Sequence, residues 1–300
     1  MTRTILRWVG RLLAGFAAVV LVAAAVVYVA SERKLRARYD TSVDPVHVPT
    51  DSASIARGEH LARNVVTCTL CHGDDLGGAV YSSIPALGTI AGPNLTRGTG
   101  GVGPDYTDED YLRAIRRGVK RDGRSLIVMP SEVFTHLSQE DMGALLAYLR
   151  NAPPVDREVP KSGFGPIGRA LLAAGKMNIL VAGKTRRLTP PASVARDTTP
   201  AYGKYLADIS GCHGCHGFGL SGGRVAGPPD LPPASNLTPA GIGQWTEQDF
   251  VRSLRLGRRP DGSSLNEFMP WKVFRGMTDA ELHAIWLYLR TVPAKPFGNK

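Results

Sequence analysis

Cys68-Thr69-Leu70-Cys71-His72 and its second copy, Cys212-His213-Gly214-Cys215-His216, decide the fold of this chain. In each stretch, two cysteines are separated by two residues and followed at once by histidine. This is the arrangement that holds a c-type haem: the two sulfurs bond to the haem vinyl groups, and the adjacent imidazole reaches the iron. The sequence therefore predicts two covalently bound haem c groups, one on each motif.

Close cysteine pairs also form zinc sites and redox-active disulfides, so both alternatives need weighing. A four-cysteine zinc site usually draws its two pairs from roughly 15 to 20 residues apart, and these two pairs are far more distant. A redox dithiol explains neither the histidine after each pair nor the lack of a strand-helix alternation around the first pair. The chain has 4 Cys, all of them in the two motifs, which leaves none for a structural disulfide.

A second ligand for each iron is predicted at Met129-Pro130 and Met269-Pro270, which occupy matching positions after the two motifs. A thioether opposite the histidine favours ferrous iron and raises the reduction potential. The following proline biases each methionine toward extended backbone, which suits a ligand carried on a loop. The predicted axial pairs are therefore His72 with Met129 and His216 with Met269.

Other side chains could compete for these positions. They are methionines within or at the start of predicted helices and histidines without a counterpart in the other repeat: Met142, Met277, His60, His136, His213 and His283. His136 is the strongest competitor because it is close to Met129 in sequence. Its counterpart in the second half is Gly276.

An internal repeat organises everything between the motifs and the chain end. Thr107 to Asp110 matches Thr246 to Asp249, and each stretch predicts a capping box that opens a helix. Each of these helices should end near a glycine, Gly118 in one half and Gly257 in the other. The sequence predicts a mainly α fold.

Each half is also framed by a helix before the haem motif and a helix at its end. The first helices lie around Ile55 to Val66 and Ala201 to Ile209, and we expect them to cross the last helices at Gly58 and Gly203. Glycine-rich stretches after each motif have no clear periodicity and are predicted to be loops over the cofactor.

Leu12 to Ala30 is an unbroken apolar run, long enough at about 1.5 Å per residue to cross a hydrocarbon core roughly 30 Å thick. Arginines precede it, as in a signal sequence, and Ala23-Ala24-Ala25 resembles a cleavage site. The run is longer than the roughly 7 to 15 residues of a signal core, which favours an uncleaved anchor.

These features divide the chain into five predicted segments. They are a membrane anchor with its flanks at 1–41, a tether at 42–51, a first haem domain at 52–152, a basic linker at 153–198 and a second haem domain at 199–300. Within the linker, Pro166 to Val181 predicts a helix. It could lie on an anionic membrane or a partner as a basic amphipathic helix, or it could pack between the two haem domains.

Each half resembles a class I cytochrome c domain in the order of first helix, haem motif, loop methionine and last helix. The resemblance covers roughly 52 to 152 and 199 to 297. The stretches Asn236-Leu237-Thr238-Pro239 and Gly241-Ile242-Gly243-Gln244-Trp245-Thr246, with Met269-Pro270, are similar to the cytochrome c subunits of membrane-bound alcohol, aldehyde and gluconate dehydrogenases. Those subunits commonly carry three haem domains, whereas this chain has two.

The resemblance implies an electron carrier and not an enzyme. Electrons would come from a dehydrogenase or quinol-oxidising complex and pass to a terminal oxidase or a soluble cytochrome. Because haem is attached to bacterial c-type cytochromes outside the cytoplasm, we expect one crossing of the inner membrane, with the haem domains in the periplasm. The alternatives are a haem enzyme with one open iron, such as a peroxidase or sulfur-compound dehydrogenase, and a docking subunit of a dehydrogenase complex.

The net charge of +10 raises the question of nucleic-acid binding. No nucleic-acid motif is present, and the expected compartment argues against such a partner. The positive charge is better suited to an acidic redox partner or to lipid headgroups.

Overall fold

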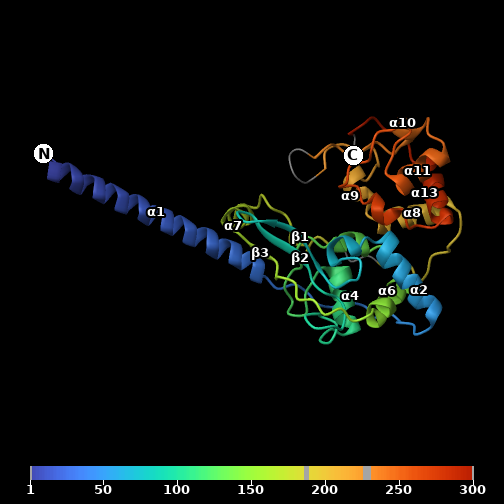
Figure 1. Cartoon of the computed structure of the whole chain (residues 1–300), viewed down its shortest axis with the longest axis horizontal. Coiled ribbons are helices and arrows are strands. Elements are labelled where there is room, and N and C mark those ends of the chain that lie inside the picture. The colour runs from blue at the N-terminus through green and yellow to red at the C-terminus, as the bar shows by residue number, and fades with distance from the viewer. Residues whose placement is uncertain (1, 186–188, 226–230, 299–300) are drawn as a thin grey trace.

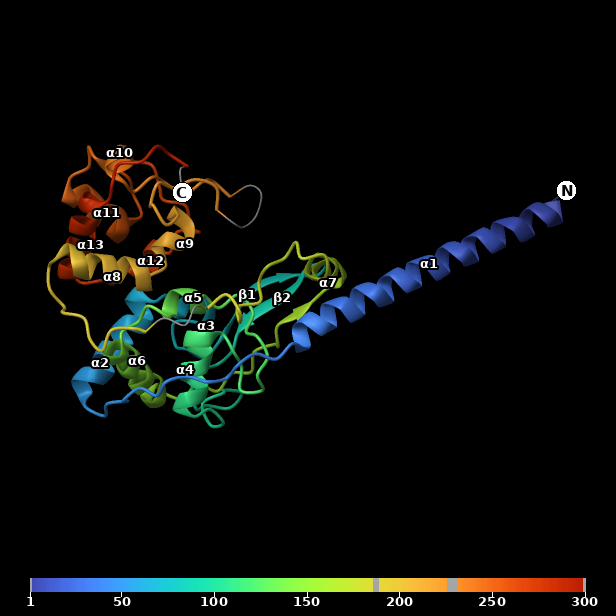
Figure 2. The same ribbon diagram turned by 180° about the vertical axis from the view of Figure 1, so that it is seen from behind.

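A computed structural model of the chain describes residues 2–185, 189–225 and 231–298, as a long helix followed by two helical halves (Figures 1 and 2). The long helix, α1 (Thr2–Arg36), projects away from the rest of the molecule. Among the described residues it is the one helix long and apolar enough to cross a membrane. The predicted fold class is confirmed, because the described chain is mainly helical. The predicted linker and second haem domain both include a few residues outside the described ranges.

Among the described residues, the two halves repeat a common set of five helices in the same order, and each half adds one short helical element of its own. The first half contains α2 (Ser52–His60), its continuation as a π-helical turn η1 (Leu61–Val65), α3 (Thr69–His72), α4 (Asp108–Arg117), α5 (Ser131–Phe134) and α6 (Gln139–Asn151). The second half contains α8 (Pro200–Ile209), α9 (Cys212–His216), α10 (Pro239–Ile242), α11 (Glu247–Leu256), α12 (Trp271–Phe274) and α13 (Asp279–Thr291).

The predicted helix boundaries at α4 and α11 are confirmed. In α4, the Asp110 amide donates to Thr107 Oγ1 at 3.3 Å, and the Asp110 carboxylate accepts from the Thr107 amide at 3.0 Å. The second half forms the same box, with distances of 3.2 and 3.1 Å. Both helices end at a left-handed glycine, Gly118 at φ 64° and Gly257 at φ 66°, as the sequence predicts.

The first and last helices of each half cross at glycine. A Cβ on Gly58 would overlap the backbone carbonyl of Ala144 in α6, and a Cβ on Gly203 would overlap that of Ala284 in α13. The absence of a side chain therefore lets each pair of helices approach closely. This crossing fixes where the haem motif, which follows the first helix, lies relative to the last helix.

The region after the first haem motif differs from the prediction. Instead of a loop, β1 (Ala79–Ile84) and β2 (Gly88–Gly92) form an antiparallel hairpin, and β2 also pairs with β3 (Gly163–Phe164) from the linker. The prediction failed because the third strand of this sheet comes from the distant linker, and the glycine-rich strands carry no alternating pattern of their own.

Residues 42–51, the predicted tether, form no helix or strand and pack along the first half. Val43, Val46 and Val48 contact its hydrophobic core, and Arg113 Nε donates to the Thr41 carbonyl at 2.9 Å. The first half therefore begins close to the end of α1.

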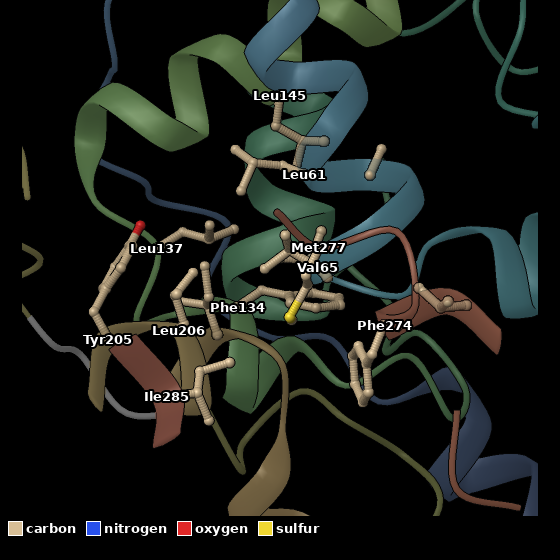
Figure 3. Close-up of a cluster of buried hydrophobic side chains, with 14 of the residues drawn as sticks. Leu61, Val65, Phe134, Leu137, Leu145, Tyr205, Leu206, Phe274, Met277 and Ile285 are labelled. Carbon is tan, nitrogen blue, oxygen red and sulfur yellow. The ribbon is translucent and has the colours of Figure 1, made fainter. Parts of the chain in front are cut away.

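The two halves share a hydrophobic cluster. Figure 3 shows Leu61, Val65 and Phe134 of the first half gathered with Phe274 and Met277 of the second half. All five side chains are buried. The halves therefore pack against each other over an apolar contact, and are not two independent units on a flexible linker.

Candidate functional site

The two haem motifs fold alike, each as about one helical turn. Because residues three and four apart lie on the same side of a helix, the second cysteine and the histidine project near the first cysteine. A left-handed residue precedes each turn, Thr67 at φ 54° in one half and Gly211 at φ 76° in the other. A glycine ends each turn, Gly73 at φ 75° and Gly217 at φ 81°.

Both motif histidines make the same hydrogen bond. Nδ1 of His72 lies 2.8 Å from the carbonyl oxygen of Pro93, and Nδ1 of His216 lies 2.8 Å from that of Ser235. A carbonyl can only accept, so each Nδ1 carries the proton and each Nε2 is left with its lone pair. This is the arrangement that a metal-ligating histidine needs.

In the first half, burial also favours the neutral form of the motif histidine. It lowers the pKa of His72, against the hydrogen bond to Pro93, so the imidazole is neutral near pH 7. A neutral imidazole is the form that coordinates iron.

The second half contains an apolar cavity that brings all four of its predicted haem residues together. Cys212, Cys215, His216 and Met269 line it, with Arg259 the charged side chain among the described lining residues. The rest of the lining is largely apolar and includes Leu237, Ile242, Trp245, Phe250, Leu254, Phe274 and Ile285. An apolar chamber with one cationic side chain suits an apolar macrocycle that carries carboxylates.

The cavity residues support the fit of haem in chemical terms. Burial raises the pKa of Cys212 to about 12, and likewise that of Cys68, so these thiols are held in apolar surroundings, where vinyl groups would lie. Within the described part of the chain, no group of three or more His, Cys, Asp or Glu side chains gathers that could hold a metal ion. Two thiols in an apolar cavity beside a histidine are a donor set that fits covalently attached haem.

The two predicted methionine ligands lie on equivalent loops. The Ser131 amide donates to the Met129 carbonyl at 2.9 Å, and the Trp271 amide donates to the Met269 carbonyl at 2.8 Å. Helices α5 and α12 begin directly after these turns. In the first half, Cys68 and Met129 both pack at the edge of the same hydrophobic core.

An asparagine in each half ties the haem-side loop to the chain after the last helix. Asn94 Nδ2 donates to the Val155 carbonyl at 2.7 Å, and Asn236 Nδ2 donates to the Lys295 carbonyl at 2.8 Å. Each Oδ1 accepts from the amide and hydroxyl of the threonine two residues on. Asn94 is fully buried. The matching stretches Asn94-Leu95-Thr96 and Asn236-Leu237-Thr238 therefore form equivalent structural turns.

Met277 lines the same cavity as Met269, whereas the other competing ligands have other positions or partners. Met142 is fully buried in the core, Met277 borders the second cavity within the cluster between the halves, and His136 is exposed. Three histidines lie within ion-pair distance of carboxylates: His60 with Glu281 at 2.7 Å, His213 with Asp208 at 3.0 Å and His283 with Glu247 at 2.7 Å. Arg259 was missed by the sequence reasoning, because nothing in its local pattern distinguishes it from the other surface arginines.

Comparison with known proteins agrees with the predicted division into two haem domains. A sequence model of the cytochrome c family matches residues 55–153 and 200–293, one match in each half. The chain is 30% identical over 280 residues to the fructose dehydrogenase cytochrome subunit of Gluconobacter japonicus, covering 84% of this chain and 55% of the relative.

Two further relatives are subunits of the same kind. The cytochrome c subunit of the quinone alcohol dehydrogenase of Gluconobacter oxydans is 30% identical over 294 residues, covering 83% of this chain and 57% of the relative. The gluconate 2-dehydrogenase cytochrome c subunit of Pantoea cypripedii is 31% identical over 269 residues, with coverages of 78% and 56%. The chain thus spans a little over half the length of these relatives.

Proposed function

The chain belongs to the cytochrome c family, and from this premise we propose that it is a two-haem electron carrier anchored in the membrane by α1. In each half the cysteine pair would hold the haem covalently, and one histidine and one methionine would ligate its iron. The pairs are His72 with Met129 and His216 with Met269. Haem bound in this way supplies reversible one-electron oxidation and reduction of iron.

The observation that carries this proposal is the match between the halves. Both orient the motif histidine by a 2.8 Å hydrogen bond from Nδ1 to a backbone carbonyl, and both place a methionine on the turn before a short helix. In the second half the cavity lining includes the cysteines, the histidine and the methionine together. A histidine and a methionine on each iron, as proposed, would leave no open site there, which favours a carrier over a peroxidase-like enzyme.

The chain's own residues have separate tasks in this proposal. The carbonyls of Pro93 and Ser235 hold the protons on Nδ1, so that each Nε2 remains a ligand. The apolar lining of the second cavity would exclude water and favour the less charged ferrous state of a bound haem, which would raise its reduction potential. Arg259 would balance a haem carboxylate at the cavity wall.

A dehydrogenase is the electron donor we propose, because the relatives are cytochrome subunits of fructose, alcohol and gluconate dehydrogenases. A terminal oxidase or a soluble cytochrome would accept the electrons. Since bacterial haem attachment occurs outside the cytoplasm, α1 would cross the inner membrane with both halves in the periplasm. A role in docking the catalytic subunit is compatible with this arrangement.

Substrate-driven haem reduction tests the function. The tagged full chain is isolated from host membranes in a mild detergent, and its haem absorption is followed after adding fructose, an alcohol or gluconate. We expect one substrate class to reduce both haems, with no change in a substrate-free sample. A chain that comes out alone and stays oxidised with every substrate would contradict a dehydrogenase donor.

A further inference from the structure

The linker helix α7 (Pro166–Ala173) packs against the carboxyl end of α1, not between the two halves (Figures 1 and 2). Arg169 Nη1 lies 3.0 Å from Ser31 Oγ and 3.0 Å from Glu32 Oε2. Its guanidinium also stacks 4.6 Å from the ring centroid of Tyr28. The one charged side chain of α7 is therefore turned toward α1 and paired there.

The end of α7 is held by α1 as well. Lys34 Nζ donates to the carbonyls of Leu172 at 2.8 Å and Ala173 at 3.0 Å. These carbonyls belong to the last turn of α7, where a cation is favourable. The two helices are thus joined by complementary polar contacts at the middle and at the carboxyl end of α7.

These contacts fix the level along α1 at which α7 lies. The α1 residues involved, Tyr28 to Lys34, overlap the end of the apolar run Leu12 to Ala30 and continue just beyond it. If α1 crosses a bilayer, this level is the boundary between the hydrocarbon and the headgroups. Exposed Arg33 and Arg36 lie at the same level, as expected beside lipid phosphates.

The surface of α7 turned away from α1 is apolar. Ile167 is 52% exposed, and Pro166 and Ala170 are exposed beside it. The tip of the β1–β2 hairpin continues this surface with Ile84, which is 49% exposed. The tip is fixed to α7, because the Ile167 amide donates to the Ala86 carbonyl at 3.0 Å.

We propose that α7 and the hairpin tip form a second membrane contact, which rests in the interfacial region of the bilayer that α1 crosses. Its occupant is lipid, because the apolar surface is continuous with the membrane end of α1 and its one cation is already paired. The inference rests on the proposed anchoring by α1. It also links the first haem site to the membrane, since Gly92 at the end of the hairpin packs directly on the Cys71 backbone.

Spin labels on the full-length holoprotein in vesicles of phosphatidylcholine and phosphatidylglycerol test this surface. One label is placed at Ile167→Cys, one in mid-α1 at Val20→Cys, and one at Leu256→Cys, an exposed site of the second half. The unsubstituted chain, treated in the same way, reports any labelling of the native cysteines. Accessibility to oxygen and to a water-soluble nickel complex is then measured by power saturation.

We expect the oxygen-to-nickel accessibility ratio at Ile167→Cys to lie several-fold above that at Leu256→Cys and below that at Val20→Cys. If Val20→Cys reports lipid while Ile167→Cys is as aqueous as Leu256→Cys, the interfacial contact is overturned and the anchor stands. If Ile167→Cys is shielded from both reagents, a protein covers the surface and the proposal also fails. An aqueous Val20→Cys would overturn the anchor and the interfacial contact together.

Discussion

His60 in the first half and Glu281 in the second lie 2.7 Å apart, between Nε2 and Oε2, at the contact between the halves. Arg57 reaches the same carboxylate, with Nη1 3.1 Å from Glu281 Oε1, while its Nε lies 2.9 Å from Asp141 in its own half. Glu281 also completes the capping box of α13 by accepting from the Thr278 amide at 2.9 Å. One buried carboxylate therefore joins the start of a terminal helix to the opposite half.

This carboxylate should make stability depend on pH in acid. Burial by itself would raise the pKa of Glu281, but the hydrogen bond and charge of His60, the Thr278 amide and Arg57 lower it to about 2. A lowered folded-state pKa means that the contribution is complete above the unfolded pKa, near 4.5, and is lost as the pH falls toward 2. The shift corresponds to about 3 kcal/mol.

We therefore expect Glu281→Gln to lower the free energy of unfolding by about 3 kcal/mol at pH 7, with the difference from the unsubstituted chain shrinking below pH 4. Guanidinium unfolding at several pH values measures this difference in unfolding free energy. Glu247→Gln is the matched control, because its pair with His283 is about one-third exposed and should be worth less than about 1 kcal/mol. Equal effects of the two substitutions would argue against the buried network.

Removing either methionine ligand should change one haem and spare the other. Met129→Leu or Met269→Leu is expected to remove half of the weak near-infrared band of methionine-ligated ferric haem, and to lower the potential of that haem within the roughly 0.8 V range set by axial ligands. Met142→Leu is the control, since Met142 is fully buried in the core. A loss of the band in the control alone would reassign the ligand.

The glycine crossings should tolerate no added side chain. Gly203→Ala would force a Cβ into the Ala284 carbonyl, and we expect a loss of at least about 1 to 3 kcal/mol in unfolding free energy. At Gly163 an added Cβ meets nothing within 4 Å, so Gly163→Ala should leave thermal unfolding nearly unchanged. A Gly203→Ala chain as stable as Gly163→Ala would mean that α8 and α13 can separate without cost.

The asparagine turns should matter for stability and not for the haem spectrum. Asn94→Ala removes the 2.7 Å hydrogen bond to the Val155 carbonyl from a buried site, with an expected cost of about 1 to 3 kcal/mol. Asn151→Ala removes a similar 2.8 Å bond from an exposed residue and should cost far less. Thermal melts compare the two, and similar melting temperatures would contradict the structural role of Asn94.

The sequence predicted those parts of the fold that are encoded locally. The capping boxes at Thr107 and Thr246 and the terminal glycines Gly118 and Gly257 depend on residues within a few positions of one another, and the structure confirms them. The crossings at Gly58 and Gly203 were also predicted, because small residues in the same place of a repeat mark close backbone approach.

The parts that were not predicted depend on distant partners. The hairpin pairs with Gly163 of the linker, α7 docks on Glu32 of α1, and Arg57 meets Glu281 across the two halves. Charged residues such as Arg169 and Arg57 look alike in sequence, whether they are solvated or buried in a pair. Only the packing of the chain distinguishes the two cases.

Optical spectra of the purified full chain, which report its haem content and the ligands of each iron, test the two-haem carrier most directly. We expect two covalent haems per chain, the near-infrared methionine band at full intensity for both, and no rapid binding of carbon monoxide after reduction. One haem per chain, half of the band, or rapid carbon monoxide binding by one iron would contradict a carrier with two closed haem sites.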